Sequence, residues 1–354
     1  MARVTVKTIA EAVGVSPSTV SNAYNRPDQL SAELRERILA VAAELGYAGP
    51  DAAARMLRSG RAEAVGVLLT ERLSYAFSDP YAIGFLTALT EVLEQSQTSL
   101  VLMPIGYEAQ RDLGDQLPDV TAVRQANIDA MTILCIGNLH PATQLAKARG
   151  IRIVGTDIDP DPESTWVAID DVEAGALVGR HLADLGHRRV GVIADTGYPA
   201  GTLSTGLRID DITCTDCHAR LLGLSSALEE LVIVSGGHNT VDSGVAAGVA
   251  LLDDPNRPTA IVGLSDVVAL GVLQAMRDRG LSAPTDVSVS GFDDVAAAAE
   301  AGLTTVRQPI REKGLRVGEL LLDADREPRQ VLLPIELVVR ASTGAPTITP
   351  ARGR

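Results

Sequence analysis

The sequence predicts a small all-α helix-turn-helix domain followed by a larger α/β part, in which parallel sheets are flanked by helices. In residues 5–25, Ala10, Gly14 and Val20 stand at the offsets that two crossing helices and their turn require. From Ala64 onward, apolar runs alternate with helical segments, as in parallel sheets covered on both faces. Eight such runs over about 280 residues favour two sheets over one.

The helix-turn-helix prediction depends on how each residue type suits its place. Ala10 lets two helices cross closely, Gly14 supplies the positive φ of the turn, and Val20 locks the second helix onto the first. Ser16 suits the N-cap of that helix and Pro17 its first position. Small polar side chains then face outward, as base-edge and phosphate contacts need. These side chains are Ser18, Ser21 and Asn22. A capped surface helix of some other helical domain is the alternative.

A third helix should follow in residues 32–45. Leu34, Ile38, Val41 and Leu45 recur at helical spacing, and Ser31 suits its N-cap. We interpret this helix as scaffolding for the first two.

Residues 49–62 form a short Ala- and Arg-rich segment that is too short for a stable isolated helix. One interpretation is a plain linker. The other is a hinge helix that forms only on DNA, with Arg55 and Arg58 at phosphates and Leu57 as an apolar wedge in the minor groove.

The α/β part is expected to alternate strands and helices. The expected strands are residues 64–69, 100–103, 131–136, 151–155, 190–194, 231–234, 260–264 and 287–290. The clearest helices are residues 81–95, 172–185, 241–252 and 267–279. Residues 196–216 lack periodicity and are expected to be a mobile or pocket-shaping loop, and the Pro-, Thr- and Gly-rich tail from Ala341 is expected to be disordered.

Ligands of open parallel sheets bind beyond the carboxyl ends of the strands. Polar residues just past those ends are therefore the pocket candidates. They are Ser78, Asp79, Tyr81, Asn138, Asp157, Asp170, Asn239, Ser265, Asp266 and Asp293. Tyr75, Phe77, Tyr81 and Trp166 are candidates for stacking on a sugar or base face, although ordinary packing explains Phe77 and Trp166 equally well.

Length, charge and cysteine content restrict the class of protein. The 354 residues can bury more than one core, and no apolar run is long enough to cross a membrane. The net charge of −14 is uneven, because residues 1–62 carry eight Lys/Arg and six Asp/Glu, or +2, and the remainder carries −16. A basic head on an acidic body keeps phosphate attraction local. Three cysteines and a start without an apolar signal region indicate a reducing, cytoplasmic location.

Several blocks, in order, resemble the lactose/galactose repressor family of bacterial transcription regulators. The head reads T-I-A-E-A-V-G-V-S-P-S-T-V-S, and later blocks read R-H-L-A-D-L-G-H-R-R-V-G-V-I, V-S-V-S-G-F-D-D-V and L-T-T-V-R-Q-P. The resemblance runs almost end to end. It implies a helix-turn-helix headpiece (residues 1–48), a hinge (49–62), a sensor of two periplasmic-binding-protein-like subdomains (63–344) and a flexible tail (345–354). It places residues 63–187 and 304–328 in the first subdomain, and 188–303 and 329–344 in the second.

The resemblance also implies DNA-contacting residues. Positions that contact phosphates correspond to Thr5, Ser16, Thr19, Ser21 and Asn25. The base-reading face corresponds to Pro17, Ser18 and Asn22, and the hinge wedge to Leu57. Arginine is commoner in the family where this chain has Asn22. Because arginine favours guanine and asparagine favours adenine, we expect an operator that differs at that step.

For the effector, the resemblance implies a cleft between the subdomains. Tyr81 corresponds to a stacking aromatic, although the usual Asn-Pro-Phe here reads Asp79-Pro80-Tyr81. The remaining cleft positions correspond to Asp157, Asp170, Arg220, Asn239, Asp266 and Asp293. With Tyr75, these side chains suit a sugar or a nucleoside. Family members act as dimers on pseudo-palindromic operators, and effector binding usually releases the DNA.

Two other classes of function remain as alternatives. Cys214, Cys217 and His218 form a C-x-x-C-H string that would suit a metal- or redox-responsive sensor, although no fourth ligand stands at fixed spacing. A solute-binding protein would share the body but lack the head. We find no phosphate-binding, zinc-protease or nucleophile-elbow motif, so we expect no enzyme and no cofactor.

Overall fold

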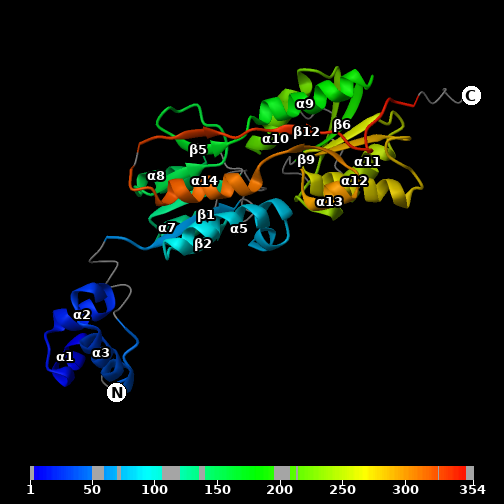
Figure 1. The fold of residues 1–354 in the computed structure, drawn as a ribbon. Helices are drawn as coiled ribbons and strands as arrows, with labels where there is room; N and C mark the ends of the chain where they lie inside the picture. The colour runs from blue at the N-terminus through cyan, green and yellow to red at the C-terminus, as the bar shows by residue number, and fades with distance from the viewer. Residues whose placement is uncertain are drawn as a thin grey trace, which may run out of the picture. The chain divides into compact units, whose positions relative to one another are not determined.

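The computed structural model describes residues 4–49, 60–69, 73–105, 120–134, 140–194, 208–212, 214–325 and 327–347. The chain divides into two compact units, a headpiece of Met1–Ala62 and a sensor of Glu63–Arg354. The headpiece is helical, whereas the sensor holds two sheets with helices on their faces (Figure 1).

Within residues 4–49, the headpiece contains three α-helices and one short 3-10 helix. These are α1 Val6–Val13, α2 Pro17–Asn25, η1 Pro27–Gln29 and α3 Ala32–Glu44. Gly14 ends α1 at φ 76°, a conformation that needs glycine, and the turn leads into α2. Ile9, Val20 and Ile38 meet in the core, one from each α-helix. The predicted helix-turn-helix and its third helix are therefore confirmed.

The first lobe of the sensor contains a parallel sheet of strand order β11-β5-β4-β3-β1-β2. Its strands are β1 Ala64–Leu69, β2 Ser99–Pro104, β3 Ala130–Leu134, β4 Arg152–Gly155, β5 Thr165–Ala168 and β11 Gln330–Leu332. Its helices are η2 Leu73–Phe77, α5 Pro80–Gln95, α7 Thr121–Gln125, α8 Pro141–Ala148 and α14 Ile310–Leu322. Helices α5 and α14 pack together over a shared apolar core that includes Phe85 and Val317.

The second lobe contains a sheet of order β12-β10-β9-β8-β6-β7, parallel except for the β10–β12 pair. Its strands are β6 Arg189–Ala194, β7 Glu230–Ser235, β8 Ala260–Gly263, β9 Ser288–Asp293, β10 Thr304–Arg307 and β12 Glu336–Val338. Its helices are α9 Asp171–Asp184, η3 Ile209–Asp211, α10 Thr215–Ser225, α11 Val241–Leu252, α12 Asp266–Asp278 and α13 Ala296–Glu300. The α9–α10 and α11–α12 pairs cover two separate cores, on opposite faces of the sheet.

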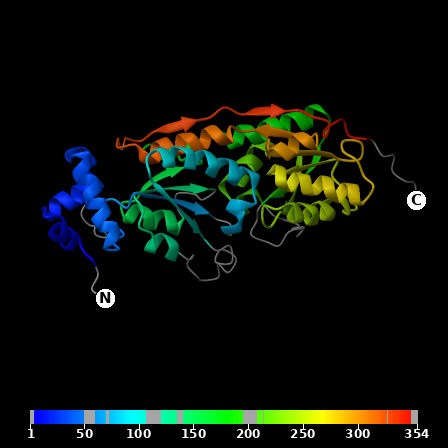
Figure 2. The same ribbon diagram turned by 60° about the horizontal axis from the view of Figure 1, so that its bottom comes forward.

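The chain passes between the lobes at three places, and these differ from the predicted boundaries. Helix α9 belongs to the second lobe, because Ala174, Val178 and Leu182 pack in the core that α10 shares. Strand β10 also belongs there, since it pairs with β9 and β12, whereas β11 pairs with β5 in the first lobe. The crossings therefore lie between β5 and α9, between β10 and α14, and between β11 and β12. Figure 2 shows the third crossing, in red, running along both lobes.

Two expected irregular segments contain ordered structure. The described part of residues 196–216 holds η3 and the start of α10, which carries Arg220. The tail is ordered through Thr347, because Val289 N–H donates to the Ser342 carbonyl at 2.8 Å and Gly344 N–H donates to Ser288 Oγ at 3.0 Å. The prediction of disorder from Ala341 was therefore wrong for these residues. Within the described residues, no helix has the length and apolar character that crossing a bilayer requires.

Candidate functional site

The exposed face of the headpiece is formed by the start of α2. Ser16 caps this helix by accepting the Thr19 N–H at 3.1 Å, and its hydroxyl also lies 2.7 Å from Ser18 Oγ and 2.8 Å from Thr19 Oγ1. Pro17 occupies the first helical position and is exposed. The hydroxyls are therefore held together at the N-terminus of a helix, where backbone N–H groups and the dipole favour a phosphate.

The next turns of α2 present amide side chains. Asn22 is half-buried and donates to Gln29 Oε1 at 3.2 Å, while Asn25 donates to the Ser21 carbonyl at 2.9 Å. Thr5 caps α1 through a reciprocal capping box with Thr8. All eight predicted headpiece residues are exposed or half-buried, so the structure leaves them accessible. The predicted hinge residues Arg55, Leu57 and Arg58 lie outside the described residues.

In the sensor, Arg220 on α10 is a buried cation held by the protein. Its Nε donates to Asp171 Oδ1 at 2.7 Å, a guanidinium nitrogen donates to the Leu264 carbonyl at 2.6 Å, and the group lies 4.9 Å from the Phe292 ring centroid. Burial alone would lower its pKa, but Asp171, Asp293 and Asp216 raise it above the usual value. Arg220 therefore stays charged.

Lys313 on α14 is a second buried cation in the same cluster. Its Nζ donates to Tyr81 Oη at 3.3 Å. Burial opposes its charge, but Tyr81, Asp216, Asp171 and Asp157 raise its pKa. Lys313 and Tyr81 come from the first lobe, whereas Asp171 and Asp216 come from the second. The charge cluster therefore spans both lobes.

Asp157, two residues after β4, places a buried carboxyl on the first-lobe side of the cluster. Its Oδ2 is buried and has no hydrogen-bond partner among the described residues. Burial raises its pKa well above the usual value, the facing Asp216 carboxyl raises it further, and Lys313 opposes the rise. A neutral carboxyl here would be able to donate a hydrogen bond as well as accept one.

Asp293, the last residue of β9, lies beside this cluster with a strained backbone at φ 112°. Gln308 lies in the segment that leads into α14, and its side chain donates to Asp293 Oδ1 at 2.6 Å. In the part of the chain that the structure describes, the buried Gln308 Oε1 has no hydrogen-bond partner. Burial raises the Asp293 pKa, and Arg220 opposes the rise. Gln308 thus adds an unsatisfied amide oxygen to the polar groups between the lobes.

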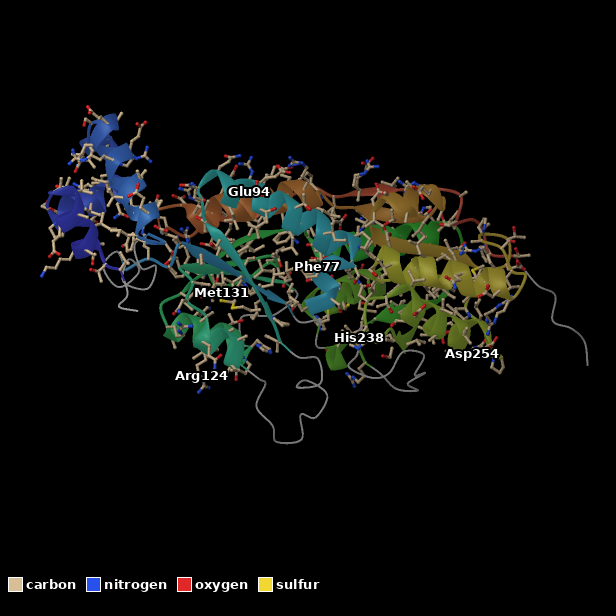
Figure 3. The ribbon with its side chains drawn as sticks, turned by 90° about the horizontal axis from the view of Figure 1, so that it is seen from below. Phe77, Glu94, Arg124, Met131, His238 and Asp254 are labelled. Carbon is tan, nitrogen blue, oxygen red and sulfur yellow. The ribbon has the colours of Figure 1, made fainter. Side chains whose placement is uncertain are left out.

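Asp79 and Asn239 join the lobes directly. Asp79 caps α5 by accepting the Ala82 N–H at 2.8 Å on Oδ1, and its Oδ2 accepts from Asn239 Nδ2 at 2.9 Å. Figure 3 labels Phe77 and His238, which stand just before these residues on the two sides of the bridge. Asn239 Oδ1 in turn accepts from the Ser265 hydroxyl at 2.6 Å.

Two predicted residues form their hydrogen bonds within the second lobe. Asp170 caps α9 by accepting the Glu173 N–H at 2.9 Å. Asp266 is 0% exposed, and its oxygens accept from Thr305 Oγ1 and the Val295 N–H. Burial raises the Asp266 pKa to about 7. The Asp266 carboxyl is therefore engaged within the second lobe, and its contact with an effector stays a prediction. Tyr75 is half-buried in η2.

Sequence reasoning missed four members of the cluster, namely Asp171, Asp216, Gln308 and Lys313. Lys313 had a usable signal, because it shares the apolar face of its helix with Val317 and Leu321. Asp216 lies inside the C-x-x-C-H string, whose pattern indicates metal or redox chemistry instead. Asp171 and Gln308 have no local signal that separates them from ordinary polar residues.

The cysteine pair has a structural place in α10. Cys214 is its N-cap, and its Sγ accepts the Cys217 N–H at 3.4 Å. Within the described ranges, no group of three His, Cys, Asp or Glu side chains is arranged to hold a metal ion.

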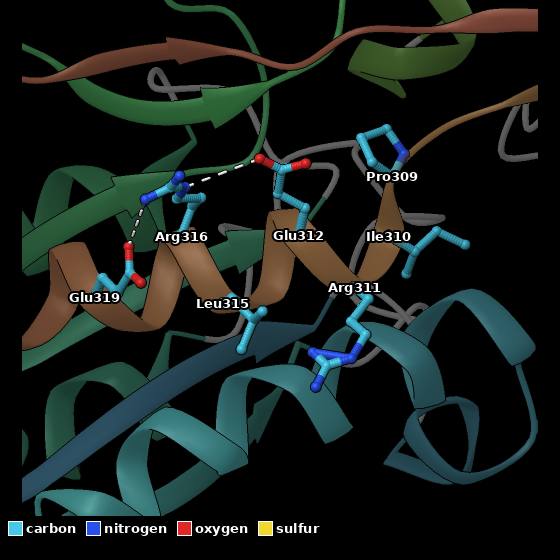
Figure 4. A pocket seen from close by; sticks show the side chains of 7 residues that line it. All are labelled: Pro309, Ile310, Arg311, Glu312, Leu315, Arg316 and Glu319. Carbon is cyan, nitrogen blue, oxygen red and sulfur yellow. Dashed lines mark hydrogen bonds and ion pairs between the residues drawn. The ribbon is translucent and has the colours of Figure 1, made fainter.

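A separate groove of about 650 Å³ lies on the outer face of α14 (Figure 4). Arg316 pairs there with Glu312 and Glu319, beside Leu315. This face is opposite to the one that carries Lys313 and the apolar core residues. The groove is therefore distinct from the charge cluster between the lobes.

Comparison with known proteins gives a consistent result. Residues 5–49 match the family described as bacterial regulatory proteins, lacI family, and residues 180–343 match the periplasmic binding protein-like domain. The chain is 37% identical to an HTH-type transcriptional regulator of Mycobacterium tuberculosis, covering 97% of this chain and 98% of that protein. A LacI family regulator from Corynebacterium glutamicum has a TM-score of 0.69 at 30% identity, covering 98% of this chain and 99% of that one. The CelR–cellobiose complex has a TM-score of 0.64 at 27% identity, covering 96% and 100%.

Proposed function

Because this chain belongs to the lacI family of bacterial regulatory proteins and is a DNA-binding transcription regulator, we propose that it is a repressor controlled by a small effector held between its lobes. The observation that carries this proposal is the buried polar cluster shared by both lobes. Asp157 and Lys313 come from the first lobe, and Asp171, Asp216 and Arg220 from the second. A ligand that contacts both sides would favour one arrangement of the lobes, and it shifts the equilibrium by its differential affinity.

The chemistry of the cluster supports a sugar or a nucleoside as the effector. Carboxyl groups outnumber cations, and Arg220 and Lys313 are already engaged by protein groups, which disfavours an anionic ligand. Carboxyl oxygens paired against hydroxyl groups, with Tyr81 to stack on a ring, suit a neutral polyhydroxylated molecule. The cellobiose bound to CelR is a sugar of this kind. We place Tyr75, Asp79, Asn239 and Asp293 at the margin of the site.

For DNA binding, we propose that two headpieces of a homodimer read a pseudo-palindromic operator, because one short recognition helix covers half a site. Ser16, Ser18 and Thr19 would contact phosphates or bases at the start of α2, and Asn22 would favour adenine. Arg55, Leu57 and Arg58 would act in the hinge.

The effector proposal is tested by a thermal-shift screen of sugars and nucleosides on the full chain. A bound ligand raises the melting temperature by mass action. The ligand found should then change operator affinity, and Asp157→Asn should reduce its thermal shift, whereas the exposed-surface variant Arg188→Met should not. A chain that binds operator DNA but responds to no sugar or nucleoside would contradict the proposed effector class.

The DNA proposal is tested with an operator selected from a random duplex library. Asn22→Ala should relax base preference at one position of each half-site, at a cost of about 1–3 kcal/mol. Leu57→Ala should weaken binding through the hinge. Glu44→Gln, at the exposed end of α3, is the control. Unchanged gel-shift affinity and preference in both test variants would refute the assignment.

A further inference from the structure

A continuous hydrogen-bond chain ties three segments of the sensor together where the two lobes meet. The Ser265 hydroxyl donates to Asn239 Oδ1 at 2.6 Å, and Asn239 Nδ2 donates to Asp79 Oδ2 at 2.9 Å. Asp79 caps α5 of the first lobe, whereas Ser265 caps α12 of the second by accepting the Val268 N–H at 3.2 Å. The chain therefore runs from the start of one helix to the start of another, through a loop residue.

The donor direction in this chain is determined by its ends. Asp79 accepts on both carboxyl oxygens, from Ala82 N–H and from Asn239. Ser265 Oγ already accepts from Val268, so its proton is directed at the Asn239 amide oxygen. This orients the Asn239 amide with its NH₂ toward Asp79. The bond across the cleft is consequently charge-assisted, the stronger class of hydrogen bond.

Burial increases the stabilisation that the Asp79–Asn239 hydrogen bond contributes. Asp79 is 2% exposed and Ser265 is buried, so a broken link would leave polar groups that must find other partners. The buried Asp293 carboxyl lies close enough to Asp79 for the two negative charges to repel each other. Burial and the Asp79 charge both raise the Asp293 pKa. Opening would relieve this repulsion, whereas the Asn239 donor favours the closed arrangement.

We propose that Asp79, Asn239 and Ser265 form an interlobe clasp that holds the cleft closed without any ligand. The three are positioning residues, and they set the fraction of sensors that are closed before an effector arrives. This proposal rests on the proposed function in one respect, namely that the two lobes open and close relative to each other. An effector that favours the closed lobes would bind more tightly in proportion to that fraction.

The test is a pair of single substitutions and their exchange. Asp79→Asn keeps the α5 cap but places its NH₂ group against the NH₂ group of Asn239. Asn239→Asp places a second carboxylate against that of Asp79. The double variant Asp79→Asn/Asn239→Asp restores every donor–acceptor pair with the same net charge. Thr240→Ala, which removes the exposed N-cap of α11 next to the clasp, is the matched control for a purely local capping loss.

Hydrogen exchange on the full chain, without effector or DNA, provides the readout for residues 73–85 and 235–243. Loss of a charge-assisted bond should raise exchange about ten- to one-hundred-fold on both sides of the cleft, because protection follows the closed population. The double variant should return both segments toward wild type. Thr240→Ala should affect only the second-lobe segment.

Three results would overturn the clasp. The first is wild-type exchange in both single variants, and the second is a change confined to the substituted side. The third is a double variant whose exchange is as fast as that of the worse single variant. Because the exchange experiment contains no ligand, its outcomes are independent of the effector screen. If Asp79→Asn folds poorly, Asn239→Asp still tests the clasp, because it leaves the α5 cap intact.

Discussion

Replacing Arg220 by methionine would show how much the buried cation contributes to the sensor. Methionine has a similar length and keeps apolar contact with Phe292, but it removes the bonds to Asp171 Oδ1 at 2.7 Å and to the Leu264 carbonyl at 2.6 Å. Asp171 then remains as a buried carboxyl whose strongest opposing charge is gone.

The magnitude follows from these two bonds. A hydrogen bond to a charged group contributes about 1.5–3 kcal/mol, so two give about 3–6 kcal/mol. Removing one partner of a buried ion pair costs about 3–5 kcal/mol by a separate argument, and the two ranges agree. With a urea slope of about 3 kcal/mol per molar, the midpoint of sensor unfolding should fall by about 1–2 M.

The assay is urea unfolding followed by far-ultraviolet circular dichroism, with Arg188→Met as the control. Arg188 pairs with Glu229, but their side chains are 76% and 67% exposed, so that variant should lose less than about 1 kcal/mol. Equal midpoint shifts in the two variants would refute the importance of the buried pair.

The pH dependence provides an independent check. Burial raises the Asp171 pKa even when Arg220 is present, and losing Arg220 raises it further. A carboxyl whose pKa is raised in the folded state does not lower the free energy of unfolding at pH values below its unfolded-state pKa of about 3.9. As the pH rises from there to the folded-state pKa, the carboxyl destabilises the folded protein increasingly. The deficit of Arg220→Met relative to wild type should therefore be larger at pH 8 than at pH 5. A deficit that does not change with pH would refute this reasoning.

Three further substitutions have defined outcomes. Gly223→Ala should destabilise the sensor by about 3 kcal/mol or more in urea unfolding, because its Cβ would lie 1.9 Å from the Val172 carbonyl oxygen; a wild-type midpoint would contradict this close helix contact. Ser16→Ala should cost the headpiece about 0.5–2 kcal/mol and speed hydrogen exchange at the Thr19 amide, and unchanged exchange there would exclude the cap as a stabilising contact. Lys313→Met should lower the urea midpoint more at pH 8 than at pH 5, since it leaves the carboxyls around it unopposed, whereas an equal loss at both values would show that the lysine contributes only packing.

The sequence by itself determined the headpiece and the order of most elements in the sensor. Gly14, Ser16 and Pro17 act on the backbone within a few residues of themselves, so their types reveal the turn and the cap directly. Apolar runs likewise reveal buried strands. The strand ends indicated Asp157, Asn239 and Asp293, which lie among the polar groups where the lobes meet.

Only the tertiary structure decided which charged groups meet. Asp79 and Asn239 are 160 positions apart, and their bond depends on how the lobes close. Lys313 faces Asp216 because α14 and α10 reach the cleft from different lobes, an arrangement set by the three crossings. Asp266 follows a strand, as the other pocket candidates do. Its carboxyl is nevertheless bonded by Thr305 and Val295 within the second lobe. Local rules describe a residue's own backbone, whereas burial and pairing depend on distant segments that no short stretch of sequence records.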